Sequence, residues 1–162
     1  MAFEWNNPSY QHIIAGWSVL SSAAAIDAYA IKLEADPTTR VHGQTGIGDT
    51  MRFAARSFAN ASLCTRQVID ISGDGPGNAG TTPAHIRAIG LLDGLMINGL
   101  VIRHPALDSA QPPGKDPLPY YQSHVIQGPG AFVEVIDSYD DYPAAIRRKL
   151  LRELSPSLAM LK

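Results

Sequence analysis

Asp74 stands in a glycine-rich segment, residues 73–80, directly after an apolar and β-branched run at residues 67–72. In an open α/β sheet, ligands bind in loops at the carboxyl ends of the strands. A carboxylate at such a position could hold a hard divalent cation such as Mg²⁺, which prefers oxygen ligands. Ser72 flanks Asp74, and Thr45 in a second glycine-rich loop, residues 42–49, could supply a further hydroxyl. The sequence therefore predicts a metal site that involves Thr45 and Asp74.

Two other interpretations of these loops stay open. Thr45 precedes an expected helix and could be its N-cap, and Asp74 could be a turn residue or an N-cap. Gly75, Gly77 and Gly80 fit the spacing G-x-G-x-x-G between a strand and a helix, which is typical of nucleotide-binding, Rossmann-like proteins. The same glycines could also serve only to form a sharp turn.

Asp70 is a carboxylate in the middle of the expected strand. Strand alternation places Val68, Asp70 and Ser72 on one face and the two isoleucines on the other. Because a carboxylate in a buried sheet is costly unless it is paired, we expect Asp70 and Ser72 to support the loop, without a catalytic role.

The remaining chain predicts a single α/β domain over residues 1–162. Apolar alternation, caps and breakers indicate strands and helices in the order β-β-α-α-β-α-β-β-α. The predicted fold is a doubly wound, mostly parallel sheet with an antiparallel edge hairpin. The expected strands are residues 2–5, 12–20, 68–72, 95–102, 124–127 and 131–136, and the expected helices are residues 23–34, 47–61, 82–93 and 142–154. Prolines predict a loop at residues 103–119.

Composition excludes several classes of function. The net charge is −2, and the densest basic run, residues 147–149, is expected to be a solvated helix face, so a nucleic-acid surface is not indicated. No apolar run is long enough for a membrane span, and the chain as given begins without a signal peptide. The single cysteine, Cys64, excludes an intrachain disulfide. No nucleophile elbow or histidine metal spacing occurs, so neither a hydrolase triad nor a transition-metal cluster is indicated.

Several segments in order along the chain closely resemble a bacterial von Willebrand factor A-like family that is catalogued only as a domain of unknown function. They are residues 43–48 (GQTGIG), 68–80 (VIDISGDGPGNAG), 97–102 (INGLVI), 120–121 (YY), 125–133 (VIQGPGAFV) and 145–150 (AIRRKL). The resemblance implies a protein-binding domain that carries a metal-ion-dependent adhesion site and is not an enzyme. In such a site Thr45 and Asp74 would match the ligands of the second and third loops.

This chain lacks the D-x-S-x-S loop and the strand that opens the family's domain. We therefore expect an incomplete site at Thr45 and Asp74, at which Mg²⁺ binds weakly or not at all to this chain alone. The missing strand would be the central strand of the sheet. We therefore expect a truncated domain, and the alternatives are that a complementing chain or a homodimer supplies the missing strand. The resemblance implies an exported or periplasmic protein. The expected function is protein binding, and the alternative is nucleotide binding through residues 73–80.

Overall fold

The computed structural model describes residues 1–37, 43–61, 64–103 and 116–155. These residues form two compact units. Unit 1 comprises the described residues within 1–69 and 77–95, and unit 2 comprises those within 70–76 and 96–155. The parts of the predicted loops that fall on residues 38–42 and 104–115 lie outside the described residues.

Unit 1 opens with an antiparallel hairpin of β1 (Ala2–Trp5) and β2 (Gln11–Ala15). Its register pairs Phe3 with Ile13 and Ala2 with Ala15. The strand predicted to reach Leu20 therefore ends five residues early. The reason is that β1 begins at Ala2, so residues after Ala15 have no partner in this hairpin.

Three α-helices complete unit 1: α1 (Ala23–Ala35), α2 (Ile47–Ser57), which continues as the 3₁₀ turn η1 (Phe58–Asn60), and α3 (Pro83–Ala88). Ser22 caps α1 as predicted, because its hydroxyl accepts a hydrogen bond from the Ala25 amide at 3.2 Å. The third helix is shorter than predicted. Gly90 and Gly94 have φ of +73° and +76°, which favours glycine and turns the chain after the helix.

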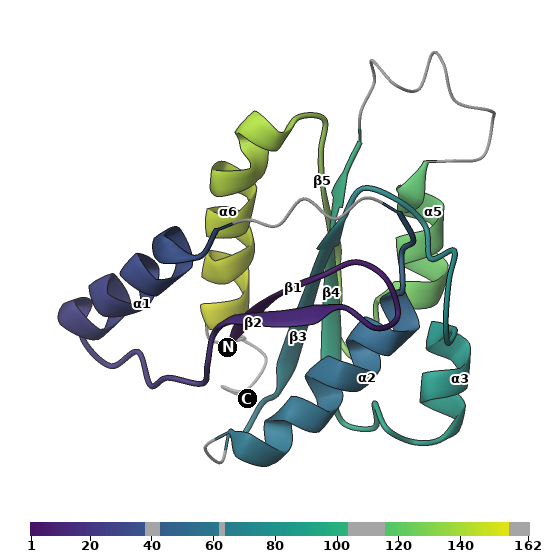
Figure 1. Cartoon of the computed structure of the whole chain (residues 1–162), viewed down its shortest axis with the longest axis horizontal. Helices are drawn as coiled ribbons and strands as arrows, with labels where there is room; N and C mark the ends of the chain where they lie inside the picture. The colour runs from purple at the N-terminus through teal and green to yellow at the C-terminus, as the bar shows by residue number, and fades with distance from the viewer. Residues whose placement is uncertain (38–42, 62–63, 104–115, 156–162) are drawn as a thin grey trace, which may run out of the picture. The chain divides into compact units, whose positions relative to one another are not determined.

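Unit 2 is built on a parallel sheet in the order β3-β4-β5 (Figure 1). The strands are β3 (Val68–Gly73, in unit 2 from Asp70), β4 (Met96–Ile102) and β5 (Val133–Ile136). Gly99 pairs with Val133, and Ile102 pairs with Ile136. After η3 (Tyr139–Asp141), helix α6 (Tyr142–Leu154) buries Ala145 against Leu100 and Ile136. The continuous burial of β4 from Ile97 to Ile102 is typical of a parallel strand.

The segment before β5 differs from the prediction. Residues 117–119, predicted as loop, lie in helix α5 (Pro117–Tyr120). The predicted strand at residues 124–127 is replaced by the end of the π-helical turn η2 (Tyr121–Val125) and by an isolated bridge between Gln127 and Ile97. Pro117 is tolerated because it lies in the first turn, where its missing N–H has no intrahelical role. The Asp116 carboxylate starts the helix by accepting a hydrogen bond from the Leu118 amide at 2.9 Å.

The α/β class is confirmed, with one refinement. The hairpin forms a two-stranded sheet of its own and is not hydrogen-bonded to the three-stranded sheet in the described structure. Among the described helices, none is long and apolar enough to cross a membrane. The single domain predicted over residues 1–162 stays a prediction.

Candidate functional site

The loop before α2 and the loop before α3 are hydrogen-bonded to each other in unit 1. The Thr45 amide donates to the Asn78 side-chain oxygen at 2.7 Å, and the Asn78 amide donates to the Thr45 carbonyl at 3.0 Å. The Gly46 amide donates to the Asn6 carbonyl at 2.6 Å, which adds the hairpin turn to the same junction. The two glycine-rich loops are thus joined at residues 45 and 78.

Thr45 itself is not the cap of the helix that follows. Helix α2 begins at Ile47 with Gly46 at the N-cap and no side-chain capping bond, so the alternative N-cap role of Thr45 is wrong. The half-buried Thr45 side chain has no hydrogen bond from its hydroxyl to the described residues of unit 1. Its oxygen therefore stays available as a ligand.

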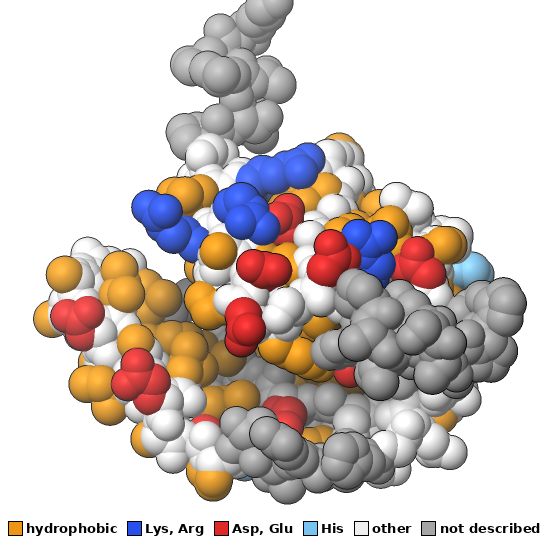
Figure 2. All heavy atoms as spheres, turned by 90° about the horizontal axis from the view of Figure 1, so that it is seen from above, with side chains coloured by type: hydrophobic (Ala, Val, Ile, Leu, Met, Phe, Trp, Pro, Cys, Tyr) orange, Lys and Arg blue, Asp and Glu red, His pale blue; other side chains and the backbone are white. Residues whose placement is uncertain are grey.

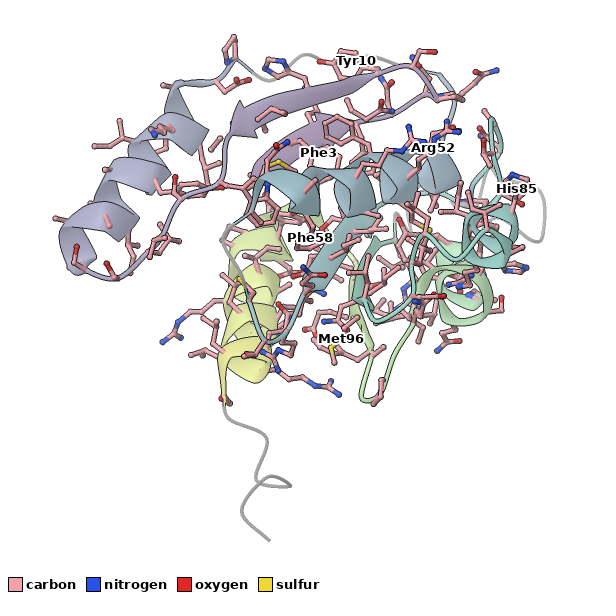
Figure 3. All side chains as sticks on the ribbon, turned by 90° about the horizontal axis from the view of Figure 1, so that it is seen from below. Phe3, Tyr10, Arg52, Phe58, His85 and Met96 are labelled. Carbon is pink, nitrogen blue, oxygen red and sulfur yellow. The ribbon has the colours of Figure 1, made fainter. Side chains whose placement is uncertain are left out.

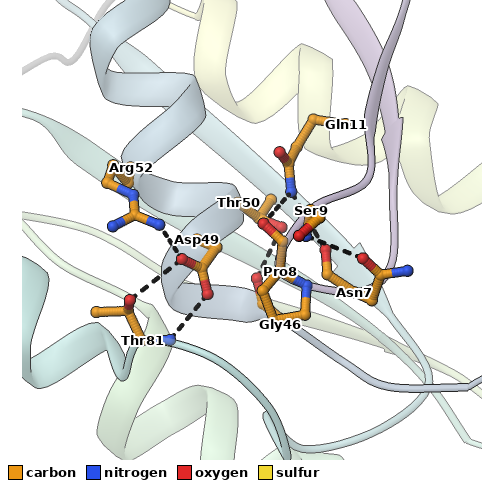
Figure 4. Close-up of polar contacts among 9 residues, drawn as sticks. All are labelled: Asn7, Pro8, Ser9, Gln11, Gly46, Asp49, Thr50, Arg52 and Thr81. Carbon is orange, nitrogen blue, oxygen red and sulfur yellow. Dashed lines mark hydrogen bonds and ion pairs between the residues drawn. The ribbon is translucent and has the colours of Figure 1, made fainter.

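A buried carboxylate that the sequence did not single out fastens this junction. Asp49 is 4% exposed and accepts hydrogen bonds from the Thr81 amide at 2.8 Å and the Thr81 hydroxyl at 3.1 Å (Figure 4). It also forms an ion pair with Arg52. These partners occupy both carboxylate oxygens, so Asp49 has a structural role here.

Two glycines allow the loops to approach this closely. A side chain at Gly48 would collide with the Thr81 carbonyl, and one at Gly80 would collide with the Asp49 carboxylate and Pro8. Gly80 also has a φ of +70°. Helix α3 is only six residues long, and the hydroxyl of its N-cap Thr82 already accepts from the His85 amide at 3.3 Å. The geometry at Gly80 favours the structural interpretation, and the nucleotide hypothesis gains no support from it.

Asp74 lies exposed at the end of β3 in unit 2, as predicted. Its carboxylate accepts a hydrogen bond from the Tyr139 hydroxyl at 3.0 Å. Burial and then the charge of Asp74 raise the pKa of Tyr139 to about 12. Ser72, on the same strand, accepts from the Tyr142 hydroxyl at 3.1 Å. Asp74 is not an N-cap, since Thr82 caps the helix that follows.

The charge of Asp74 also acts on a second tyrosine, Tyr121. Its ring is fully buried, and its hydroxyl has no hydrogen-bond partner among the described residues. Burial raises the pKa of Tyr121, and the negative charge of Asp74 raises it further. A buried hydroxyl without a partner costs about 1–3 kcal/mol. A bound water molecule or ligand oxygen beside Tyr121 would relieve this cost.

The variant Tyr121→Phe tests whether the hydroxyl is unsatisfied in solution. Because phenylalanine fills the same space without the polar atom, we expect the free energy of unfolding in urea to rise by about 1 kcal/mol. A decrease would show that a bound molecule satisfies the hydroxyl. Tyr120→Phe, at the neighbouring residue, is the matched control.

Asp70 is paired, as its mid-strand position required. The Lys149 ammonium on α6 lies 2.6 Å from the Asp70 carboxylate and 3.7 Å from Glu153, and it donates to the Gly99 carbonyl at 3.2 Å. Lys149 is 1% exposed, so the prediction that residues 147–149 form a solvated face is wrong for this residue. Its stem reaches inward because two carboxylates and a carbonyl compensate the buried charge. Asp70 thus fastens α6 to the sheet.

Glu153 is the titrating member of this cluster. It is 9% exposed and accepts a hydrogen bond from the Asn98 side chain at 2.8 Å. Burial and then the neighbouring Asp70 raise the pKa of Glu153 to about 7, against the opposing effect of Lys149. Folded protein therefore keeps a proton on Glu153 at a pH where unfolded protein has lost it.

Stability is consequently expected to fall as the pH rises toward and through 7. A raised carboxyl pKa gives stability that is present below about pH 4.5 and lost as the pH passes through the folded-state value. Between pH 5 and pH 8 the free energy of unfolding of the unaltered chain should fall by about 1–2 kcal/mol relative to that of Glu153→Gln, whose side-chain amide does not ionise in this range. Urea unfolding of both chains across this range measures the difference, and parallel curves would contradict it.

The predicted metal ligands fall in different units, Thr45 in unit 1 and Asp74 in unit 2, so their pairing stays a prediction. Within the described ranges, no three His, Cys, Asp or Glu side chains gather as a metal-ligand group. Each residue alone supplies a single side chain, which does not make a complete magnesium site. The sequence did not indicate that Tyr121, Tyr139 and Lys149 belong to the surroundings of the two aspartates. The adjacent tyrosines at residues 120–121 were a signal for Tyr121.

Comparison with known proteins identifies a family for nearly the whole chain. A model of the family described as "Protein of unknown function (DUF1194)" matches residues 1–158. No curated protein matches this chain. No solved structure matches it either.

Proposed function

We propose that this chain, which belongs to the DUF1194 family of proteins of unknown function, is a non-enzymatic domain that binds another protein. The observation that carries this proposal is a run of exposed apolar side chains in unit 1, between residues 13 and 33. Large exposed apolar patches on soluble domains are characteristic of interaction sites.

Seven large apolar side chains are exposed in this run, and we call them the apolar surface. They are Ile13, Trp17, Val19, Leu20, Ile26, Ile31 and Leu33. Val19 is 70% exposed and Ile31 is 64% exposed. Figure 2 shows hydrophobic side chains gathered at its left edge, where α1 lies.

Helix α1 is the centre of the apolar surface. It has thirteen residues, none of them buried, and its only charged residues are Asp27, Lys32 and Glu34. Isolated helices of this length are marginal in water, and most helices in proteins gain stability by packing an apolar face. A partner that covers α1 would supply this packing, at about 1.5–3 kcal/mol for each large side chain that it buries fully.

The cation site belongs to the same proposal in an incomplete form. The Thr45 hydroxyl and the Asp74 carboxylate would each offer one oxygen, and a carboxylate from the partner would add to them. Mg²⁺ requires near-octahedral coordination and gives up its water reluctantly. We therefore propose that this chain alone binds Mg²⁺ weakly or not at all.

Calorimetry separates this proposal from nucleotide binding. Titration of the chain with MgCl₂ or MnCl₂ should give little heat, and titration with NADPH should give none. Strong heat with NADPH that Gly77→Ala abolishes would favour the nucleotide hypothesis. The variant Asp74→Ala should fold normally, because it removes a single exposed hydrogen bond worth about 1 kcal/mol.

Light scattering tests whether the partner is a second copy of this chain. A homodimer through the apolar surface should dissociate in the double variant Ile26→Ser/Ile31→Ser. The matched control is Leu150→Ser/Leu154→Ser, which changes two exposed leucines on α6 in unit 2. A chain that is monomeric at all concentrations would direct the search to a different protein.

A further inference from the structure

A cavity of about 540 Å³ is lined by residues of the hairpin segment and α2, all of them in unit 1. Figure 3 shows the labelled Phe3 and Arg52 where the hairpin lies beside α2. Ile13 and Trp17 line it from the hairpin segment, and Phe53 lines it from α2. Cavities of about 300–1,000 Å³ with mostly apolar walls and a few polar groups are typical binding sites for small organic molecules.

The apolar wall is held in place. The Trp17 indole N–H donates to the Ser57 carbonyl at 3.0 Å, and its ring lies 5.2 Å from the ring of Phe58. The Phe53 ring lies 4.9 Å from the ring of Phe3 on β1. Two aromatic side chains of the cavity are therefore fixed before anything binds, which lowers the entropy cost of binding.

The cavity also carries an uncompensated positive charge. Arg52 and Arg56, one helical turn apart on α2, both line it together with Asp49. The Asp49 carboxylate is engaged by Arg52 and Thr81. Arg56 is exposed and forms no ion pair with the described residues. Two cations and one anion leave one positive charge beside an apolar wall.

We propose that this cavity binds a monocarboxylate with an apolar body, such as a medium-chain fatty acid. The apolar chain contacts Ile13, Trp17 and Phe53, and the carboxylate pairs with Arg56. A guanidinium matches a carboxylate in geometry and binds it through two parallel hydrogen bonds. The cavity shares Ile13 and Trp17 with the apolar surface, but no residue of α1 lines it, so variants in α1 test protein binding without changing the cavity wall.

Octanoate is the probe, and 1-octanol is its uncharged counterpart. The chain has two tryptophans, so the indole N–H signal of Trp17 can be followed by NMR beside that of Trp5 as an internal reference. We expect octanoate to shift the Trp17 signal with saturation. Arg56→Gln should weaken octanoate about tenfold and leave 1-octanol unchanged, because only the charged hydrogen bond is lost. Arg87→Gln on α3 is the matched charge control.

Gly16 is the position at which we expect a larger side chain to narrow the cavity and to leave the fold intact. It lines the cavity, its φ is not in the left-handed region, and a Cβ there would meet no atom within 4 Å. We expect Gly16→Leu to abolish octanoate binding, whereas Gly16→Ala should retain it. Ile26→Ser/Ile31→Ser should also bind octanoate as the unaltered chain does, so failure of the protein-binding proposal is distinguished from failure of this one.

Three results would overturn the proposal. They are the absence of any saturable Trp17 shift at millimolar octanoate, equal binding by Gly16→Leu, and equal loss of affinity in Arg56→Gln and Arg87→Gln. Thermal unfolding of each variant without octanoate verifies that a lost signal does not come from a lost fold.

Discussion

Replacing Lys149 with methionine is expected to lower the free energy of unfolding by about 3–5 kcal/mol, because it removes one partner of a buried ion cluster. The ammonium lies 2.6 Å from Asp70 and 3.7 Å from Glu153, and it lies 4.7 Å from the centre of the Phe132 ring. Methionine keeps most of the apolar stem, so the loss comes from the charge. Urea unfolding at pH 8, where Glu153 is ionised, measures it.

The triple variant Asp70→Asn/Lys149→Met/Glu153→Gln separates charge from packing. Replacing a whole buried ion cluster with neutral groups is often nearly neutral, whereas removing one member leaves uncompensated charge. We therefore expect the triple variant to recover most of the stability that the single variant loses. Equal destabilisation of both variants would show that the Lys149 stem, and not its charge, holds α6.

Gly48→Ala is expected to destabilise the chain by about 3 kcal/mol or more, although alanine is the better helix former. Helix propensity alone would favour alanine by about 1 kcal/mol. The added Cβ would collide with the Thr81 carbonyl oxygen and lie 2.8 Å from the carbonyl carbons of Thr81 and Thr82. Those atoms are backbone atoms of the loop that Asp49 holds, so they cannot move aside without breaking its hydrogen bonds.

The control for this variant is Gly16→Ala. Both changes add one methyl group to unit 1, but Gly16 has no neighbour within 4 Å of the added atom. Urea unfolding should show a large loss for Gly48→Ala and almost none for Gly16→Ala. A gain in stability for Gly48→Ala would mean that helix propensity outweighs the close contact between the two loops.

Local patterns predicted most of the elements, and tertiary contacts account for the errors. Ser22 and the apolar stripe of residues 142–154 gave α1 and α6 within one residue of their observed bounds. Strand β2 ends at the residue that pairs with the first residue of β1, and no pattern within β2 itself indicates that point. The prolines at residues 117 and 119 predict a loop, but Asp116 caps a first helical turn that tolerates them.

The candidate site was predicted only in part, because several of its contacts join residues that lie far apart in the sequence. Asp74 lies at a strand end and Asp70 is paired, as strand position and the cost of a buried carboxylate required. The partners Tyr139 and Lys149 lie 65 and 79 residues away from these aspartates in sequence. Such contacts have no local signature, and Lys149 sits in a basic run that resembles a solvated face. The resemblance to a family of unknown function is confirmed, and its von Willebrand factor A-like character stays a prediction.

Site-specific photo-cross-linking in the native cell tests the protein-binding proposal most directly. A photoreactive benzoylphenylalanine replaces Ile31 on the apolar surface or, as the control, Arg147 on the exposed side of α6. We predict a discrete cross-linked product at position 31 that Ile26→Ser weakens and that position 147 does not give. The absence of a discrete product at position 31, or the same products at both positions, would contradict a binding role for α1.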